Sequence, residues 1–90
     1  MNKNIHYTTQ FKKDFKLYIK RGYNMQQIKS IMKLLESGKE LPAKNKDHSL
    51  TGNYLNCREC HVQTDWLLIY QLFNNDIIFI RTGSHSDLFS

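Results

Sequence analysis

The chain has 90 residues, a formal net charge of +5, 40% hydrophobic residues and 23% charged residues. This length supports one core, so we expect a single domain over residues 1–90. The composition excludes an intrinsically disordered chain, and no stretch is apolar over the length that a transmembrane helix needs. The first residues also lack the apolar core of a signal peptide, so we expect a cytoplasmic protein with no membrane partner.

Charge is distributed unevenly along the chain. Eleven of the thirteen Lys and Arg residues but only three acidic residues precede Asp47, which gives that part a charge of +8. From Asp47 onward there are two basic and five acidic residues, a charge of −3. A basic half favours an anionic partner such as nucleic acid or an acidic protein. The same lysines would also suffice simply to keep two helices in water.

The first part of the chain predicts a strand and a helix. Residues 4–8 form a short strand, and Thr8 or Thr9 caps a helix that begins near Gln10. Gly22 is a natural stop for this helix. Its apolar residues recur at helical spacing and are expected to face the core: Phe11, Phe15, Tyr18 and Ile19.

A second amphipathic helix follows. Asn24 is a good N-cap, Gln27 occupies the capping-box position three residues later, and Gly38 ends the helix. Its apolar stripe consists of Ile28, Ile31, Met32 and Leu35. The two helices are expected to form an antiparallel pair, and residues 39–53 read as a polar loop.

The period then changes from helical to strand-like. Residues 57–62, 66–73 and 77–82 have strand length, and turn signals at 63–65 and 74–76 join them into an antiparallel meander. The sequence therefore predicts an α+β fold in the order β-α-α-β-β-β. Both helices are expected on one face of an antiparallel sheet, which leaves the other face free to hold a site.

The candidate chemistry lies in the second half of the chain. His48, His61 and His85 lie beside turns or at strand ends, and histidine is the side chain best suited to move protons near neutral pH. Arg81 could hold a phosphate with its planar fork of donors, and Asp65 supplies a carboxylate. These side chains suit RNA cleavage without a metal or cofactor, which needs a base, an acid and a cation near the phosphate. Against this, any single histidine is more often a surface or capping residue.

Two other interpretations of these residues are disfavoured. The histidines are scattered rather than closely paired, so a metal site is not expected, and Cys57, Cys60 and His61 lack a fourth ligand for zinc. Residues 57–61 formally match a c-type haem attachment motif. Haem attachment requires export, for which the chain shows no signal. The two cysteines are instead expected to be reduced thiols.

Two aromatic residues flank the candidate site in the sequence. An aromatic ring near a nucleotide site can stack on a base. Trp66 opens an apolar run, so core packing is the stronger interpretation for it. Phe89 lies among Ser and Asp residues, which makes a core position less favoured.

The sequence resembles the YafQ-type branch of the RelE/ParE superfamily of bacterial toxins. The similarity covers nearly the whole chain and includes the strings YTTQFKKD (7–14), KDH (46–48) with Leu50 and Gly52, RECH (58–61), DWLLIY (65–70) and RTGSHSDLF (81–89). Cys57 departs from the pattern, because relatives commonly carry an aromatic residue there.

The resemblance implies a RelE-like fold and the toxin of a type II toxin–antitoxin system that cleaves messenger RNA in the ribosomal A site. It implies a cognate antitoxin that blocks the site, with operator DNA bound only through the antitoxin. The family pattern assigns the acid–base group to His48, His61, Asp65 and His85, the phosphate contact to Arg81, and substrate positioning to Trp66 and Phe89. Within it we expect His85 to act as general acid and Asp65 or His61 as base.

Two alternatives remain at this point. One is a toxin of the ParE kind, which shares the fold and inhibits gyrase without cutting RNA. ParE-type chains lack the histidine and arginine set, which ranks this second. The other is an inactive toxin retained as an antitoxin-binding corepressor.

Overall fold

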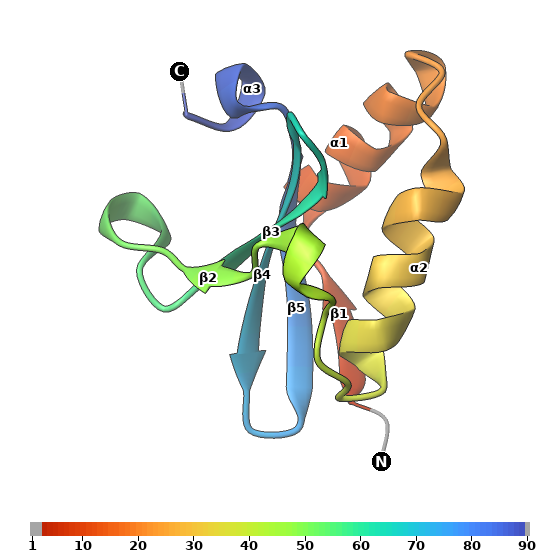
Figure 1. The fold of residues 1–90 in the computed structure, drawn as a ribbon. Coiled ribbons are helices and arrows are strands. Elements are labelled where there is room, and N and C mark those ends of the chain that lie inside the picture. The colour runs from red at the N-terminus through yellow and green to blue at the C-terminus, as the bar shows by residue number, and fades with distance from the viewer. Residues whose placement is uncertain (1–2, 90) are drawn as a thin grey trace.

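A computed structural model describes residues 3–89 (Figure 1). Its elements are β1 (Asn4–Tyr7), α1 (Thr9–Lys20), α2 (Met25–Glu36), β2 (His48–Ser49), β3 (Arg58–Gln63), β4 (Trp66–Phe73), β5 (Asp76–Gly83) and α3 (His85–Phe89). Short 3-10 turns, η1 (Ala43–Asn45) and η2 (Gly52–Tyr54), lie on either side of β2. No helix among residues 3–89 is long and apolar enough to span a bilayer.

The helix boundaries follow from local hydrogen bonding. The Thr8 hydroxyl accepts from the Phe11 N–H at 2.9 Å, and the Asn24 side chain accepts from the Gln26 N–H at 3.2 Å, so both predicted N-caps are confirmed. The capping box is absent from the described residues, because the Gln27 side chain accepts a hydrogen bond from Gln63 on β3 instead.

The sheet has the order β1-β5-β4-β3-β2. Strands β3, β4 and β5 form the antiparallel meander that the turn signals predict, and β2 adds antiparallel to β3. The α+β fold class is confirmed, but the sheet is mixed rather than wholly antiparallel, because β1 pairs parallel with β5. The pattern of alternating residues in β1 carries no signal for the direction of a neighbour so distant in sequence.

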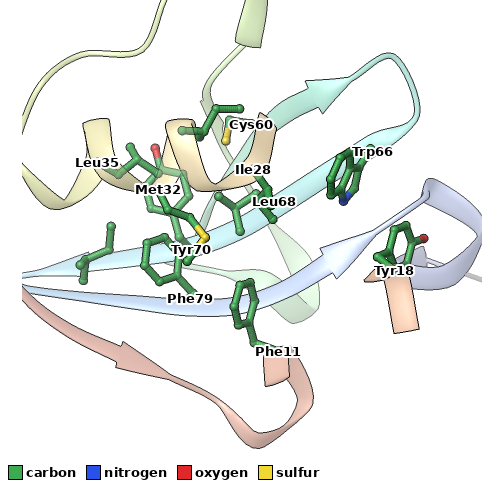
Figure 2. Close-up of a cluster of buried hydrophobic side chains, with 12 residues drawn as sticks. Phe11, Tyr18, Ile28, Met32, Leu35, Cys60, Trp66, Leu68, Tyr70 and Phe79 are labelled. Carbon is green, nitrogen blue, oxygen red and sulfur yellow. The ribbon is translucent and has the colours of Figure 1, made fainter. Parts of the chain in front are cut away.

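The main core lies between the two long helices and the sheet (Figure 2). Figure 1 shows α1 and α2 on one side of the sheet, with β2 and the turn after it on the other. The core combines two residues of α1, the stripe of α2 and alternate residues of the strands: Phe11, Tyr18, Ile28, Ile31, Met32, Leu35, Cys60, Trp66, Leu68, Tyr70, Ile77 and Phe79.

The buried stripe of α1 differs from the predicted one, because it includes Asp14 and excludes Ile19. Ile19 is 53% exposed, whereas Asp14 is only 6% exposed. Asp14 lies three residues after Phe11 and four before Tyr18, so helical geometry places its carboxylate on the same buried stripe. A buried carboxylate requires partners, and β5 supplies them.

The second face of the sheet is partly covered. Cys57, Leu67, Ile69 and Leu88 form a smaller buried cluster there, with Tyr54 packed against it. The segment of residues 39–53, which was predicted to be a loop, contains the edge strand β2 and the turn η1, and the turn η2 begins near its end.

Both cysteines are free, as predicted, and burial raises the pKa of Cys60 to about 12.

A β-bulge shifts the phase of β5. Ile69 pairs with Arg81, while the next residue, Tyr70, pairs with Phe79. Ile80 is the extra residue and packs with the second cluster, to which Ile69 also belongs. Phe79 lies in the helix-side core, so the bulge lets Ile80 and Arg81 both lie on the second face.

Trp66 is expected to contribute stability, because its indole N–H donates to the Thr82 hydroxyl at 2.9 Å and its ring stacks on Tyr18. Trp66→Phe should lower the free energy of unfolding by about 1–3 kcal/mol in urea denaturation, through lost packing and the loss of one buried hydrogen bond. Phe73→Leu is the control, because Phe73 is 63% exposed, and should change stability by less than about 0.5 kcal/mol. Equal stabilities of the Trp66 variant and the wild type would contradict this assignment.

Candidate active site

Three histidines from three elements form a row on the second face of the sheet. The ring centroids of His48 on β2 and His61 on β3 are 6.3 Å apart, and those of His61 and His85 on α3 are 6.1 Å apart. The pairing of β2 with β3 and the start of α3 directly after β5 bring these residues together. All three histidines that the sequence singles out therefore share one surface.

A buried carboxylate that the sequence analysis missed supports two of these histidines. The Glu59 side chain is 5% exposed, and its Oε1 lies 3.3 Å from Nε2 of His48 and 3.8 Å from Nε2 of His61. The signal was present in the sequence, because Glu59 precedes His61 by two positions in a strand and so shares its face.

The hydrogen bonds of His48 restrict its protonation. Its Nδ1 lies 2.7 Å from the carbonyl oxygen of Lys46, so this nitrogen carries a hydrogen. Its Nε2 faces the Glu59 carboxylate, which accepts rather than donates when ionised. The pair places a buried carboxylate beside the histidine at the end of the row.

Asp65 orients the third histidine. One of its oxygens, Oδ1, accepts from the backbone N–H of His85 at 3.0 Å and lies 2.9 Å from Nδ1 of the same residue. The backbone bond first, and then the side-chain bond, hold the pKa of Asp65 below its ordinary value. An ionised Asp65 fixes a hydrogen on Nδ1 of His85, which leaves Nε2 for a substrate.

Arg81 is held by the buried carboxylate of α1. Its Nε donates to Oδ2 of Asp14 at 2.9 Å and its Nη2 to Oδ1 at 3.0 Å, which raises the pKa of Arg81 further above its ordinary value. Arg81 reaches this helix because the β1 pairing ends at Phe79 and leaves the following edge of β5 to α1. Its charge is thereby balanced through Nε and Nη2, and the Tyr54 side chain also lies close enough to the guanidinium to raise its pKa.

The two aromatic candidates lie on opposite sides of the sheet. The ring of Phe89 is 48% exposed and lies 6.1 Å from that of His85, with Tyr54 edge-on to it at 5.7 Å. Trp66 is 1% exposed and lies in the helix-side core beside Tyr18, as Figure 2 shows. The structure therefore brings Phe89 to the histidine row and gives Trp66 a packing position.

The short helix α3 is attached to α1 through polar contacts. The Tyr18 hydroxyl accepts from the Ser84 N–H at 2.7 Å and donates to the Asp87 carboxylate at 2.6 Å, and Arg21 pairs with Asp87 at 2.9 Å. A Cβ on Gly83 would lie 3.2 Å from the Tyr18 oxygen, so glycine permits this close approach. These contacts fix the position of His85 at the start of α3.

The alternative zinc ligands do not come together. Cys60 belongs to the helix-side core and Cys57 to the cluster on the second face. Across residues 3–89, no three His, Cys, Asp or Glu side chains are arranged to hold a metal ion.

These features define a small α+β protein with a histidine and carboxylate site on one face of its sheet. Residues 3–90 match the family model described as the bacterial toxin YafQ of type II toxin–antitoxin systems. The chain is 42% identical over 90 residues to the mRNA interferase toxin YafQ of Escherichia coli K12, covering 99% of this chain and 98% of that protein. The chain belongs to the YafQ family of type II toxins.

Solved structures agree with this membership. The E. coli DinJ-YafQ toxin–antitoxin complex contains a chain that is 42% identical, with a TM-score of 0.93 and full coverage of both chains. A metal-bound toxin from Helicobacter pylori is 36% identical, with a TM-score of 0.90 and coverage of 97% and 99%.

The pKa of Asp65 offers a direct test of its contact with His85. Because the native pKa is lowered, the contact stabilises the fold above the unfolded pKa, and this contribution is lost as pH falls through the native value. A carbon-detected NMR titration should give a pKa for Asp65 that is lower than the ordinary value for an aspartate. His85→Ala should raise the value only in part, because the backbone N–H remains, whereas Ser86→Ala should leave it unchanged. An ordinary Asp65 titration in the wild type would refute the arrangement.

Proposed function

We propose that this chain is an endoribonuclease toxin that cleaves messenger RNA on the ribosome by metal-independent acid–base catalysis. The observation that carries the proposal is the row of three histidines with carboxylates on His48 and His85. The related E. coli protein named as an mRNA interferase toxin supports the same activity. The action on ribosomes places the protein in the cytoplasm.

The geometry suits a two-proton mechanism. A base removes the proton of the ribose 2′-hydroxyl, the 2′-oxygen attacks the adjacent phosphorus, and an acid protonates the departing 5′-oxygen. The products are a 2′,3′-cyclic phosphate and a 5′-hydroxyl. We assign the acid to His85, whose Nδ1 lies 2.9 Å from the Asp65 carboxylate, and the base to His61, whose ring lies 6.1 Å away.

The remaining residues have supporting roles in this scheme. Arg81 presents to the phosphate the Nη1 group that Asp14 does not use, where negative charge develops in the transition state. Phe89 offers an exposed ring beside His85 on which a base can stack, a contact typically worth about 1–3 kcal/mol. Glu59 lies beside both His48 and His61 and holds their rings on the same face. Trp66 acts only through the core that supports β4.

Alanine replacement of His85 tests the chemistry. Expression of the wild-type chain without an antitoxin should arrest growth, and primer extension should show new cleavage ends in a reporter message. His85→Ala should abolish the arrest and reduce ribosomal cleavage by about 10²-fold or more. His6→Ala is the matched control, because His6 lies on β1, pairs with Asp76 and is outside the row. It should behave as wild type.

Other outcomes point to the alternatives. DNA-damage signalling without cleavage ends would replace the proposal with a gyrase-inhibiting toxin. Tight antitoxin binding with neither arrest nor cleavage would indicate a corepressor.

We also propose an antitoxin contact on the opposite side of the molecule. A groove of about 910 Å³ lies between α1 and α2. Phe11, Phe15 and Met32 are among its apolar lining residues, and four lysines also line it: Lys12, Lys16, Lys29 and Lys33. An apolar floor with basic edges fits an acidic amphipathic segment. The DinJ-YafQ complex shows that a relative pairs with an antitoxin, which makes the cognate antitoxin the proposed occupant.

Charge reversal in the groove tests this contact. Lys16→Glu with Lys29→Glu should weaken the complex with the cognate antitoxin by about tenfold or more in calorimetry, because both edges would then repel an acidic segment. Lys20→Glu with Lys39→Glu changes the same charge outside the groove and should have little effect. Equal losses in the two double variants would mean a general charge effect and would exclude a specific contact.

A further inference from the structure

A second cavity adjoins the histidine row. It has a volume of about 300 Å³ and lies between the η1 segment and the end of β3, where His61, Lys44, Lys46 and Thr64 line it. His61 belongs to both the row and this pocket, so a molecule bound in the pocket would touch the proposed catalytic group. All of its lining residues except Val62 have polar or charged side chains, which distinguishes it from the groove between the long helices.

The backbone beside the pocket is firmly held. Asn45 is 6% exposed, and its side-chain amide donates to the carbonyl oxygen of His61 at 2.7 Å. Lys46 has a left-handed backbone with φ of 49°, and its carbonyl oxygen meets Nδ1 of His48 at 2.7 Å. One short segment thus contacts two histidines of the row while presenting two lysines. The backbone that carries the lysines is therefore held beside the histidine row.

The balance of charge singles out these two lysines. Arg81 is paired with Asp14, and Arg58 is paired with Asp47 at 3.2 Å. Lys44 and Lys46 form no ion pair with any residue in the range 3–89. The row itself contains the carboxylates of Glu59 and Asp65, so the arginines leave it without excess positive charge. The uncompensated cations that adjoin the row at His61 are therefore those of the pocket.

We propose that this pocket binds the phosphate that neighbours the scissile phosphate of a single-stranded RNA. Lys44 and Lys46 supply the positive charge, and the Thr64 hydroxyl supplies a neutral donor. The inference rests on the proposed function and deepens it, because it defines the path of the bound RNA backbone, from Arg81 along the histidines to the pocket. Lysine contacts to phosphate hold the strand in register without reading its sequence.

The test compares one RNA with a series of neutralised versions. The probe is an uncleavable 2′-O-methyl hexanucleotide, and each version carries one uncharged methylphosphonate in place of one phosphate. Binding to the full chain is measured by fluorescence anisotropy. The wild type should lose affinity at the scissile position and at one neighbouring position. Lys44→Gln with Lys46→Gln should bind the unmodified RNA several-fold more weakly and should be insensitive to neutralisation at that neighbouring position only.

Salt dependence gives a second readout. Loss of one phosphate contact should reduce the slope of log affinity against log salt by about 0.7, so the double variant, which loses the one phosphate of the pocket, should lose about 0.7. Lys20→Gln with Lys39→Gln is the matched control and should keep the wild-type neutralisation profile. Inorganic phosphate at the RNA's phosphate concentration should not compete, because a free ion lacks the other contacts of the strand.

Activity separates failure of the pocket from failure of the proposed function. If the wild type cleaves messages on ribosomes but the Lys44 and Lys46 variant keeps the wild-type neutralisation profile and salt slope, the pocket assignment is overturned and the nuclease stands. If the wild type shows the expected profile without cleavage, the pocket is an RNA phosphate site and the nuclease assignment fails. Absence of binding to every hexanucleotide overturns the pocket assignment.

Discussion

The carboxylate of Asp14 is the interaction on which the two layers of the molecule depend. It accepts hydrogen bonds from the Arg81 side chain, the Thr82 backbone and the Gln10 amide, and so joins α1 to the end of β5. Removal of one partner from a buried ion pair costs about 3–5 kcal/mol, because the other charge remains desolvated. The same bonds hold the Arg81 guanidinium just before α3 begins. Stability and the proposed phosphate contact therefore share one carboxylate.

The sheet separates packing from chemistry by the alternation of its strands. In β3, Cys60 lies in the helix-side core, while Glu59 and His61 lie on the other face. In β4, Trp66 and Leu68 belong to the helix-side core, while Leu67 supports the second face. Because the three histidines lie on β2, β3 and α3, regular elements of the fold bring them together without a mobile loop. The basic helices and the lysines beside the row carry positive charge that the carboxylates of the row do not balance.

Most of the fold could be predicted from local patterns, because hydrophobic period and turn residues determine helices and short hairpins. The parallel pairing of β1 with β5 could not, since no local pattern encodes a partner some seventy residues away. The fold places the three histidines, Asp65 and Phe89 near one another, and the roles that the resemblance gives them stay predictions, while the buried position of Trp66 agrees with the apolar run that it opens. Asp14 and Glu59 were missed although their spacing placed them on informative faces, because charged residues are ordinarily assumed to lie in water.

The bulge in β5 has a consequence for how this sequence can change over time. Because Ile80 is an extra residue against β4, it returns Thr82 to the helix side while leaving Arg81 on the other. A side chain in this strand can be exchanged for a similar one. Removal of a single codon, in contrast, would move every side chain from Arg81 to the start of α3 to the opposite face of the sheet. Insertions and deletions should therefore be purged from this segment during evolution even where substitutions accumulate, so its length should vary less among descendants than its composition.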